Sequence, residues 1–199
     1  MKIEFLDIDH PKRDLVQAHI QKVYQDTYGA KITSFAPLLV SVEKLDGEIV
    51  CAGGIRTAQD GFFSDTYLDC DLNEAIQIID GTDTHANEIM EVVSVASTTP
   101  FPVLPMLDAM IAWGREQGMT CGVFTATGPL RKLLKHTKMP FKELCKADAL
   151  RIEDPESWGT YYQSDPAVCV FNEALNTQRN LSPRAKSQIT SVTNIANAS

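Results

Sequence analysis

One acidic residue stands inside the most strand-like segment of this sequence. Glu91 is the only acidic residue in the β-branched run at residues 89–96, which is predicted to form a central strand. A carboxylate in such a strand lies buried or at a cleft, and the loss of water raises its pKa toward the range useful to a general base. We therefore predict that Glu91 removes a proton in a reaction. The structural alternative is that it pairs with a buried cation such as Arg56.

Arg56 follows the apolar run at residues 48–55, where another strand is predicted. Its guanidinium can bind a carboxylate through two parallel hydrogen bonds, either on Glu91 or on a small ligand. The alternative for Arg56 is a solvated cation at the end of a strand. Arg56 and Glu91 are thus the two candidate catalytic residues.

Three further polar residues could contact a ligand. Thr125 ends a predicted buried strand, at the carboxyl edge where open α/β sheets bind ligands. Asp69 could bind an ammonium group, and the alternative is that it belongs to a solvated acidic face with the neighbouring aspartates. Tyr162 could close a pocket or donate a proton, whereas aromatic residues that follow a tryptophan also pack in cores.

The elements that position these residues follow from periodicity and turn residues. Apolar residues at helical spacing predict helices, and alternating or β-branched runs predict strands. Asp46-Gly47 is predicted to join two strands in a tight hairpin, because this dipeptide accepts positive φ angles. The expected helices span residues 11–28, 72–79, 103–117 and 127–138, and the expected strands span residues 2–8, 38–45, 48–55, 62–67, 88–97, 119–125, 141–144 and 167–171.

Length and composition favour one globular domain with a tail. The chain has 199 residues, of which 44% are hydrophobic and 22% charged, which is enough for one sizeable core. The order of elements predicts an α/β domain over residues 1–172, with an antiparallel start and one strand–helix–strand crossover. Residues 173–199 are rich in Asn, Ser, Thr and Gln and contain no aromatic residue, so we predict a solvated or partner-dependent polar tail.

The charge and the cysteines argue against several classes of function. With 18 basic and 26 acidic residues the formal net charge is −8, which repels nucleic acid and anionic lipid. The five cysteines lack C-x-x-C spacing and the four histidines lack an H-E-x-x-H motif, so we expect neither a disulfide framework nor a metal site. No run approaches the ~20 apolar residues of a membrane span, so we expect a cytoplasmic protein without integral membrane contact.

Several segments, taken in their order along the chain, resemble the thermostable hemolysin family. The resemblance covers roughly residues 10–171. The segments are Tyr28-Gly29-Ala30 with Phe35-x-Pro37-x-Leu39, Tyr67-Leu68-Asp69, Ile89-Met90-Glu91-Val92, Val123-Phe124-Thr125-Ala126-Thr127 with Leu130-Arg131, and Trp158-Gly159-x-Tyr161-Tyr162 before Pro166-x-Val168. Members of this family resemble acyl-homoserine-lactone synthases and share the GNAT acyltransferase fold, a mixed sheet flanked by helices.

This resemblance implies an enzyme that transfers an acyl group to an amine. In the homoserine-lactone synthases an arginine ends the strand after the hairpin and a carboxylate sits in the central strand, and Arg56 and Glu91 occupy the corresponding places. The resemblance also places Tyr67 and Asp69 near the cleft. It implies an acyl-CoA or acyl carrier protein donor and a small amine or amino acid as acceptor, with Glu91 as base and Arg56 orienting the acceptor.

The expected donor loop departs from the GNAT pattern. The usual pyrophosphate loop is basic and rich in glycine, whereas residues 97–105 contain three prolines and no Gly, Lys or Arg. Donor phosphates could still bind at the helix N-terminus, with help from Ser97, Thr98 or Thr99. A carrier-protein donor, which presents less phosphate at this loop, becomes more plausible.

Two other functions compete with acyl transfer. The family name implies membrane lysis, either by direct attack or through a surfactant product such as an N-acyl amino acid. The absence of an apolar span and the net charge of −8 oppose direct attack. The altered donor loop also fits a non-catalytic module that binds an acyl ligand on the same fold.

Overall fold

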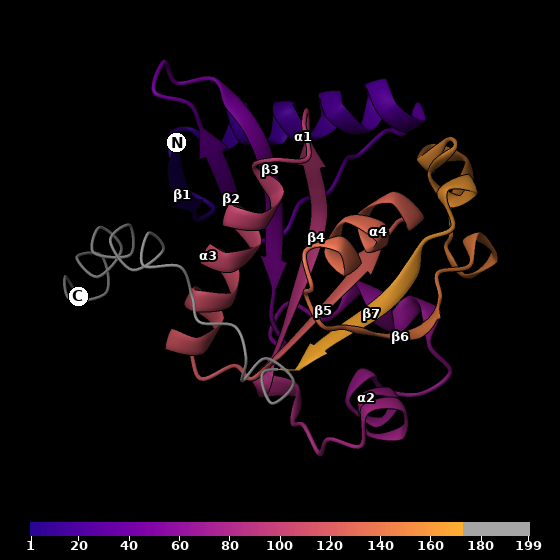
Figure 1. The fold of residues 1–199 in the computed structure, drawn as a ribbon. Coiled ribbons are helices and arrows are strands. Elements are labelled where there is room, and N and C mark those ends of the chain that lie inside the picture. Colours follow the sequence, from indigo (N-terminus) through magenta and orange to yellow (C-terminus); the bar gives the residue numbers. More distant parts are fainter. Residues whose placement is uncertain (173–199) are drawn as a thin grey trace.

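A computed structural model describes residues 1–172 of the chain, which form a mixed β-sheet flanked by helices (Figure 1). The strands lie in the order β1-β2-β3-β4-β5-β7-β6. Their bounds are β1 Lys2–Leu6, β2 Leu38–Glu43, β3 Ile49–Arg56, β4 Ile89–Ser97, β5 Cys121–Ala126, β6 Lys142–Lys146 and β7 Ala167–Asn172. The α-helices are α1 Arg13–Tyr28, α2 Leu72–Asp80, α3 Val103–Glu116 and α4 Gly128–His136. This arrangement confirms the expected GNAT-type fold class.

The centre of the sheet is the parallel pair β4 and β5, joined by the crossover helix α3. The other neighbouring strands pair antiparallel. The pairing of β4 with β5 runs from Ile89 opposite Cys121 to Val92 opposite Phe124, and then stops. Because β4 continues to Ser97 and β5 to Ala126, the two strands part beyond this point.

A bulge in β4 accompanies the parting of the strands. Gly54 of β3 lies opposite Val93, but Ala52 lies opposite Ala96, so β4 holds one residue more than β3 over this stretch. Within it, Ser94 has a φ of 53°, which is left-handed and uncommon for a residue other than glycine. The bulge turns the β4 backbone away from a regular ladder next to the opening.

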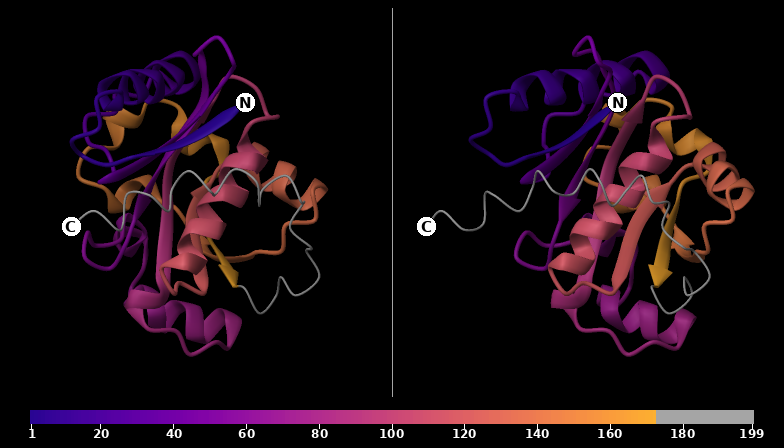
Figure 2. Two further views of the ribbon diagram at one scale, coloured as in Figure 1. Left: turned by 90° about the vertical axis from the view of Figure 1, so that its left-hand side faces the viewer. Right: turned by 60° about the vertical axis from the view of Figure 1, so that its left-hand side comes forward.

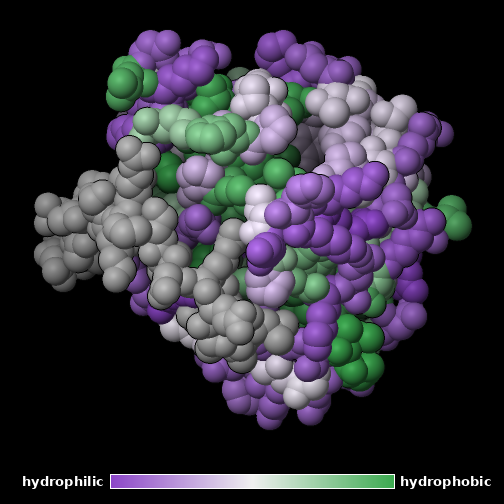
Figure 3. All heavy atoms as spheres, viewed as in Figure 1, coloured by the Kyte–Doolittle hydropathy of each residue, from purple (hydrophilic) through white to green (hydrophobic). Residues whose placement is uncertain are grey.

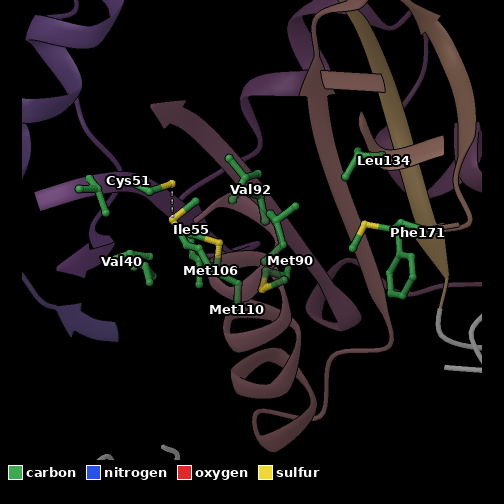
Figure 4. Packing of buried hydrophobic residues seen from close by; sticks show 14 residues of the cluster. Val40, Cys51, Ile55, Met90, Val92, Met106, Met110, Leu134 and Phe171 are labelled. Atoms are coloured by element: carbon green, nitrogen blue, oxygen red, sulfur yellow. Dashed lines mark hydrogen bonds between the residues drawn. The ribbon is translucent and has the colours of Figure 1, made fainter. Parts of the chain in front are cut away.

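The two faces of the sheet carry different helices, as the views in Figure 2 show. Helix α1 packs against β3 and β4, and its apolar residues form one buried cluster with residues of β1 and β2. Helix α3 packs on the other face, where Met106 and Met110 meet Val40, Ile55 and Met90 (Figure 4). Helix α4 covers the same face through Leu134.

Most of the sequence-based elements are confirmed, with shifts of one to a few residues at their ends. Gly29 and Gly118 follow their helices with left-handed φ angles of 69° and 80°, and Gly47 turns the hairpin at 89°. The strand expected at residues 62–67 is wrong, because Phe63–Tyr67 forms a short 3-10 helix, η1. The reason is non-local: Glu91 binds the first backbone N–H groups of η1, so these groups do not form a ladder.

Strand β7 ends at Asn172, and the predicted polar tail at residues 173–199 lies outside the described residues, so the domain boundary expected at residue 172 stays a prediction. Among residues 1–172, the longest and most apolar helices are still too short or too polar to cross a membrane.

Candidate active site

A cavity of about 220 Å³ lies where β4 and β5 part. Val92, Val93 and Ser94 line it from β4 and Thr125 lines it from β5. The segment 31–36, which follows α1, forms another wall. The aromatic residues of its lining are Tyr24, Phe35, Phe63, Tyr67, Trp158 and Tyr161. The opening between the strands therefore becomes a pocket with an aromatic wall.

A smaller cavity of about 40 Å³ lies on the α3 and α4 face of the same opening. Its wall is almost wholly apolar, with Leu107 and Ile111 from α3 and Leu130 and Leu134 from α4. The two cavities share Val92, Ser94 and Thr125 in their linings. The two cavities therefore adjoin where β4 and β5 part, and we call the gap between these shared residues the passage.

Thr125 stands at this passage with an unused hydroxyl. Its Oγ1 is buried and has no hydrogen-bond partner among the described residues. A buried hydroxyl without a partner costs free energy relative to one in water, so such a group favours a ligand that satisfies it. Thr125 is thus a predicted site residue that lines both cavities and has a hydroxyl without a hydrogen-bond partner among the described residues.

Glu91 is 1% exposed and does not line either cavity. Its Oε1 accepts hydrogen bonds from the Ser64 N–H (2.8 Å) and the Ser64 Oγ (2.6 Å), and its Oε2 accepts one from the Phe63 N–H (2.7 Å). Burial raises the pKa of Glu91 above its ordinary value, while these hydrogen bonds and the charge of Arg56 act in the opposite direction. The carboxylate thus lies directly behind the wall that η1 contributes to the larger cavity.

Arg56 lines the larger cavity and lies opposite Glu91 in the register of β3 and β4. No ion pair joins the two side chains within residues 1–172. Instead, Arg56 Nε donates to the carbonyl of Gly61 (2.8 Å) and its NH2 group donates to the carbonyl of Asp60 (2.6 Å). These bonds fix one edge of the guanidinium to the loop before η1 and keep its charge at the cavity.

Tyr67 lines the larger cavity and is 3% exposed. Its hydroxyl lies 2.6 Å from the hydroxyl of Tyr162, which itself does not line the cavity. Burial raises the pKa of Tyr67, so this phenol stays protonated at neutral pH. The structure thus brings Tyr67 and Tyr162 together as a hydroxyl pair at the rim of the site.

Four predicted site residues lie apart from the cavities. Asp69 is exposed and pairs with Arg151, which also donates to the Leu68 carbonyl (3.1 Å). The other three lie at the end of β4 and directly after it: Ser97 is the last residue of the strand, and Thr98 and Thr99 follow it. The hydroxyls of Ser97 and Thr98 donate to the backbone carbonyl of Val50 at 3.2 and 3.3 Å.

Sequence reasoning missed most of the aromatic wall. Trp158 lies 5.2 Å from Tyr161 and 5.9 Å from Phe63, measured between ring centroids, and Tyr24 stacks on Tyr161 at 6.1 Å. Lys31, an exposed residue that also lines the cavity, was missed as well. The only available signal was the concentration of aromatic residues at positions 24–35 and 158–162.

One side of α4 lines the smaller cavity and the other is hydrophilic. Leu130 and Leu134 face inward, whereas Lys132, Lys135 and His136 are exposed. Figure 3 shows hydrophilic residues gathered over this helix. Within the described residues, no group of three or more His, Cys, Asp or Glu side chains is placed to hold a metal ion.

The sequence matches the model of the thermostable hemolysin family over residues 6–177. None of the curated proteins matches this chain.

Solved structures share the fold at low sequence identity. FeeM, an N-acyl amino acid synthase from uncultured soil microbes, superimposes with a TM-score of 0.59 at 12% identity, over 94% of this chain and 99% of that chain. The AHL synthase LasI gives a TM-score of 0.59 at 8% identity, over 86% and 89% of the two chains. A Lactobacillus plantarum protein named as an N-acetyltransferase gives 0.52 at 11% identity, over 86% and 99%.

Proposed function

We propose that this chain, which belongs to the thermostable hemolysin family, is an N-acyltransferase that moves an acyl group from a thioester to a small amine. The observation that carries the proposal is the opening between β4 and β5, which joins a large polar and aromatic cavity to a small apolar one. Such a pair of cavities suits one polar and one apolar substrate that meet at the opening between the two strands. The fold that this chain shares with FeeM and LasI supports the assignment.

The acyl chain would occupy the smaller cavity and its thioester carbonyl would lie at the passage. Beyond Val92, the β4 backbone has no partner on the β5 side, so its polar groups are available to a substrate there. The Thr125 hydroxyl can donate to the thioester oxygen on which negative charge develops. The apolar wall of α3 and α4 side chains would hold the chain out of water.

The acceptor would occupy the larger cavity. Among residues 1–172, Arg56 and Lys31 are the charged residues of its lining, and no carboxylate of these residues belongs to that lining. A pocket with two cations favours an anionic group, and a guanidinium suits a carboxylate in particular. The acceptor is therefore an amine that also carries a carboxylate, as an amino acid does.

Proton transfer would fall to Glu91 and Tyr67. Glu91 Oε2 accepts a single hydrogen bond and so retains an acceptor site, and because Glu91 lies behind the η1 wall the proton of the attacking amine would reach it through an intervening water. The amine nitrogen then bonds to the thioester carbon and the carbon–sulfur bond breaks. Tyr67, hydrogen-bonded to Tyr162, can return a proton to the leaving thiolate.

The donor is an acyl-CoA or an acyl carrier protein. The segment 97–99 leads from β4 into α3, where the helix N-terminus can face a phosphate. The side chains of Ser97 and Thr98 are hydrogen-bonded to Val50, so backbone N–H groups rather than these hydroxyls would make the contact.

Purified protein, incubated with acyl-CoA or acyl carrier protein donors and a panel of amino acids, tests the proposal by mass spectrometry of the products. An N-acyl amino acid is expected, with its formation reduced in Arg56→Met. If neither donor gives a product but an acyl-CoA raises the melting temperature, the protein is a binding module and the proposal is wrong.

The family name suggests a second function, lysis of membranes, for which the same reaction offers a route. An N-acyl amino acid has an apolar chain and a charged head, which makes it a surfactant. Lysis of red cells should then require the donor and the amino acid together with the protein. Lysis by the protein alone, equally strong in Thr125→Val, would instead show direct attack.

A further inference from the structure

A third cavity, of about 20 Å³, adjoins the smaller cavity near the C-terminal end of α3, and its lining includes Arg115 and Thr120. Gly114 of α3 and Cys121 at the start of β5 lie in its wall. Its lining shares Met90, Ile111, Gly122 and Phe171 with that of the smaller cavity described above. The three cavities therefore form a series, and these four residues separate the second cavity from the third.

The separation between the second and third cavities depends on Gly122 and on the ring of Phe171 that covers it. Gly122 of β5 lies opposite Phe171 of β7, and a Cβ placed on Gly122 would lie 3.7 Å from the Phe171 Cδ1 atom. This is ordinary van der Waals contact, so an alanine fits here without moving the chain. The absent side chain leaves space in the passage beside the ring.

Met90 forms the opposite side of the separation. It is 3% exposed and packs on α3, where a Cβ placed on Gly114 would lie 3.2 Å from the Met90 Sδ atom. Figure 4 shows Met90 and Val92 on one side of this region and Leu134 and Phe171 on the other. A methionine side chain is unbranched and adopts many shapes, so it can fill the passage or yield to a ligand.

We propose that Met90, Gly122 and Phe171 form a length gate that stops the acyl chain at the end of the second cavity. This inference rests on the proposed acyltransferase function. From Ser94 to Met90 the acyl chain would run along β4 for a length of four residues, which is about 13 Å at the rise of a strand. That length corresponds to an acyl chain of roughly ten carbons with bonds of about 1.5 Å. The donor class is thus a medium-chain acyl thioester, and the third cavity admits longer chains only when the gate opens.

Competition among thioesters from hexanoyl to hexadecanoyl, with product quantities read by mass spectrometry, tests the gate. Met90→Ala joins the second and third cavities, so the ratio of kcat/KM for hexadecanoyl over decanoyl donors should rise about tenfold or more, since each buried methylene contributes to binding. Gly122→Ala narrows the passage and should shift the preference toward shorter donors. An unchanged profile in both variants overturns the gate.

Met106→Ala is the matched control. Met106 is a fully buried methionine of α3 that lines none of the three cavities. Its loss should lower stability without changing the chain-length profile. Melting-temperature shifts with free fatty acids of the same lengths give a second measurement that does not need turnover. If the wild-type protein transfers no acyl group, the proposed function fails. The gate is still supported if the melting-temperature shifts depend on fatty-acid length and this dependence changes in Met90→Ala. It is refuted if wild type and Met90→Ala show equal shifts.

Discussion

Both the amide and the hydroxyl of Ser64 donate to the same oxygen of Glu91, at 2.8 and 2.6 Å. The two residues are 27 positions apart, and their contact fixes η1 against β4. Phe63 and Tyr67, which η1 carries, line the larger cavity. Glu91 therefore shapes the larger cavity in addition to its proposed role as a base.

The first prediction concerns the pH dependence of stability at Glu91. Burial raises the pKa of this carboxyl in the folded state above its ordinary value of 4.5, so the folded state binds the proton more tightly than the unfolded state. The contribution of Glu91 to stability is then fully present below about pH 4.5 and is lost as the pH rises through the raised value. Urea unfolding at a series of pH values should show this loss in wild type and not in Glu91→Gln.

Glu91→Gln separates the two roles of this residue. The glutamine amide nitrogen would face an N–H donor of Phe63 or Ser64, which leaves a buried donor unsatisfied and costs about 1–3 kcal/mol of stability. As a base, Glu91 also sets the acidic limb of the pH–rate profile. If Glu91→Gln lowers stability but keeps that limb, Glu91 is a positioning residue only.

The second prediction uses the unpartnered hydroxyl of Thr125. Thr125→Val keeps the shape of the side chain and removes a group that has no hydrogen bond among the described residues. Stability should be unchanged or slightly higher, while kcat/KM falls about tenfold or more because a donor to the developing oxyanion is lost. An unaltered rate, measured together with an unaltered melting temperature, would contradict the assigned contact.

The third prediction concerns Arg13, which is 8% exposed. It donates to the carbonyls of Leu6 and Asp7 beside β1 and to those of Ala36 and Pro37 at the end of the cavity wall. Arg13→Ala leaves these carbonyls without their donor and should destabilise the fold by about 3–5 kcal/mol. Arg13→Lys should restore only part of the loss, since an ammonium lacks the planar fork of a guanidinium. Denaturant unfolding measures both values, and full restoration by lysine would be inconsistent with this geometry.

The fourth prediction concerns Gly159, which follows the aromatic wall. Its φ is 52°, and a Cβ at this position would overlap the backbone carbonyl of Tyr28. Gly159→Ala should therefore displace Trp158 from the cavity and lower the melting temperature. The intrinsic fluorescence of Trp158 should change in the same variant, whereas Gly61→Ala provides a comparison with a left-handed φ of 70° and no atom within 4 Å of the added Cβ. Equal effects in the two variants would show that backbone strain alone is responsible.

Local sequence patterns predict most of the helices and strands, and they predict that Glu91 lies buried or at a cleft. The hairpin at Gly47, the helix end at Gly29 and the proline in the first turn of α4 are properties of a few neighbouring residues, and periodicity reports which face of an element is apolar. The same reasoning predicted that Thr125 ends a strand, and β5 ends one residue later at Ala126, whereas the contact of Thr125 with a ligand stays a prediction. It could not assign partners to these side chains, because a contact between distant segments leaves no local pattern.

The parting of β4 and β5 beyond Val92, and with it the larger cavity, is visible in the tertiary structure and in no local sequence pattern. Ser94 has a left-handed φ, and because this residue is a serine and not a glycine, the sequence carries no signal for that conformation. Glu91 binds Ser64 rather than Arg56, and the cavity wall combines residues near position 30 with residues near position 160. The physical reason is that strand pairing, bulges and cavity walls minimise the free energy of the whole packed sheet, which depends on pairs of residues far apart in the chain.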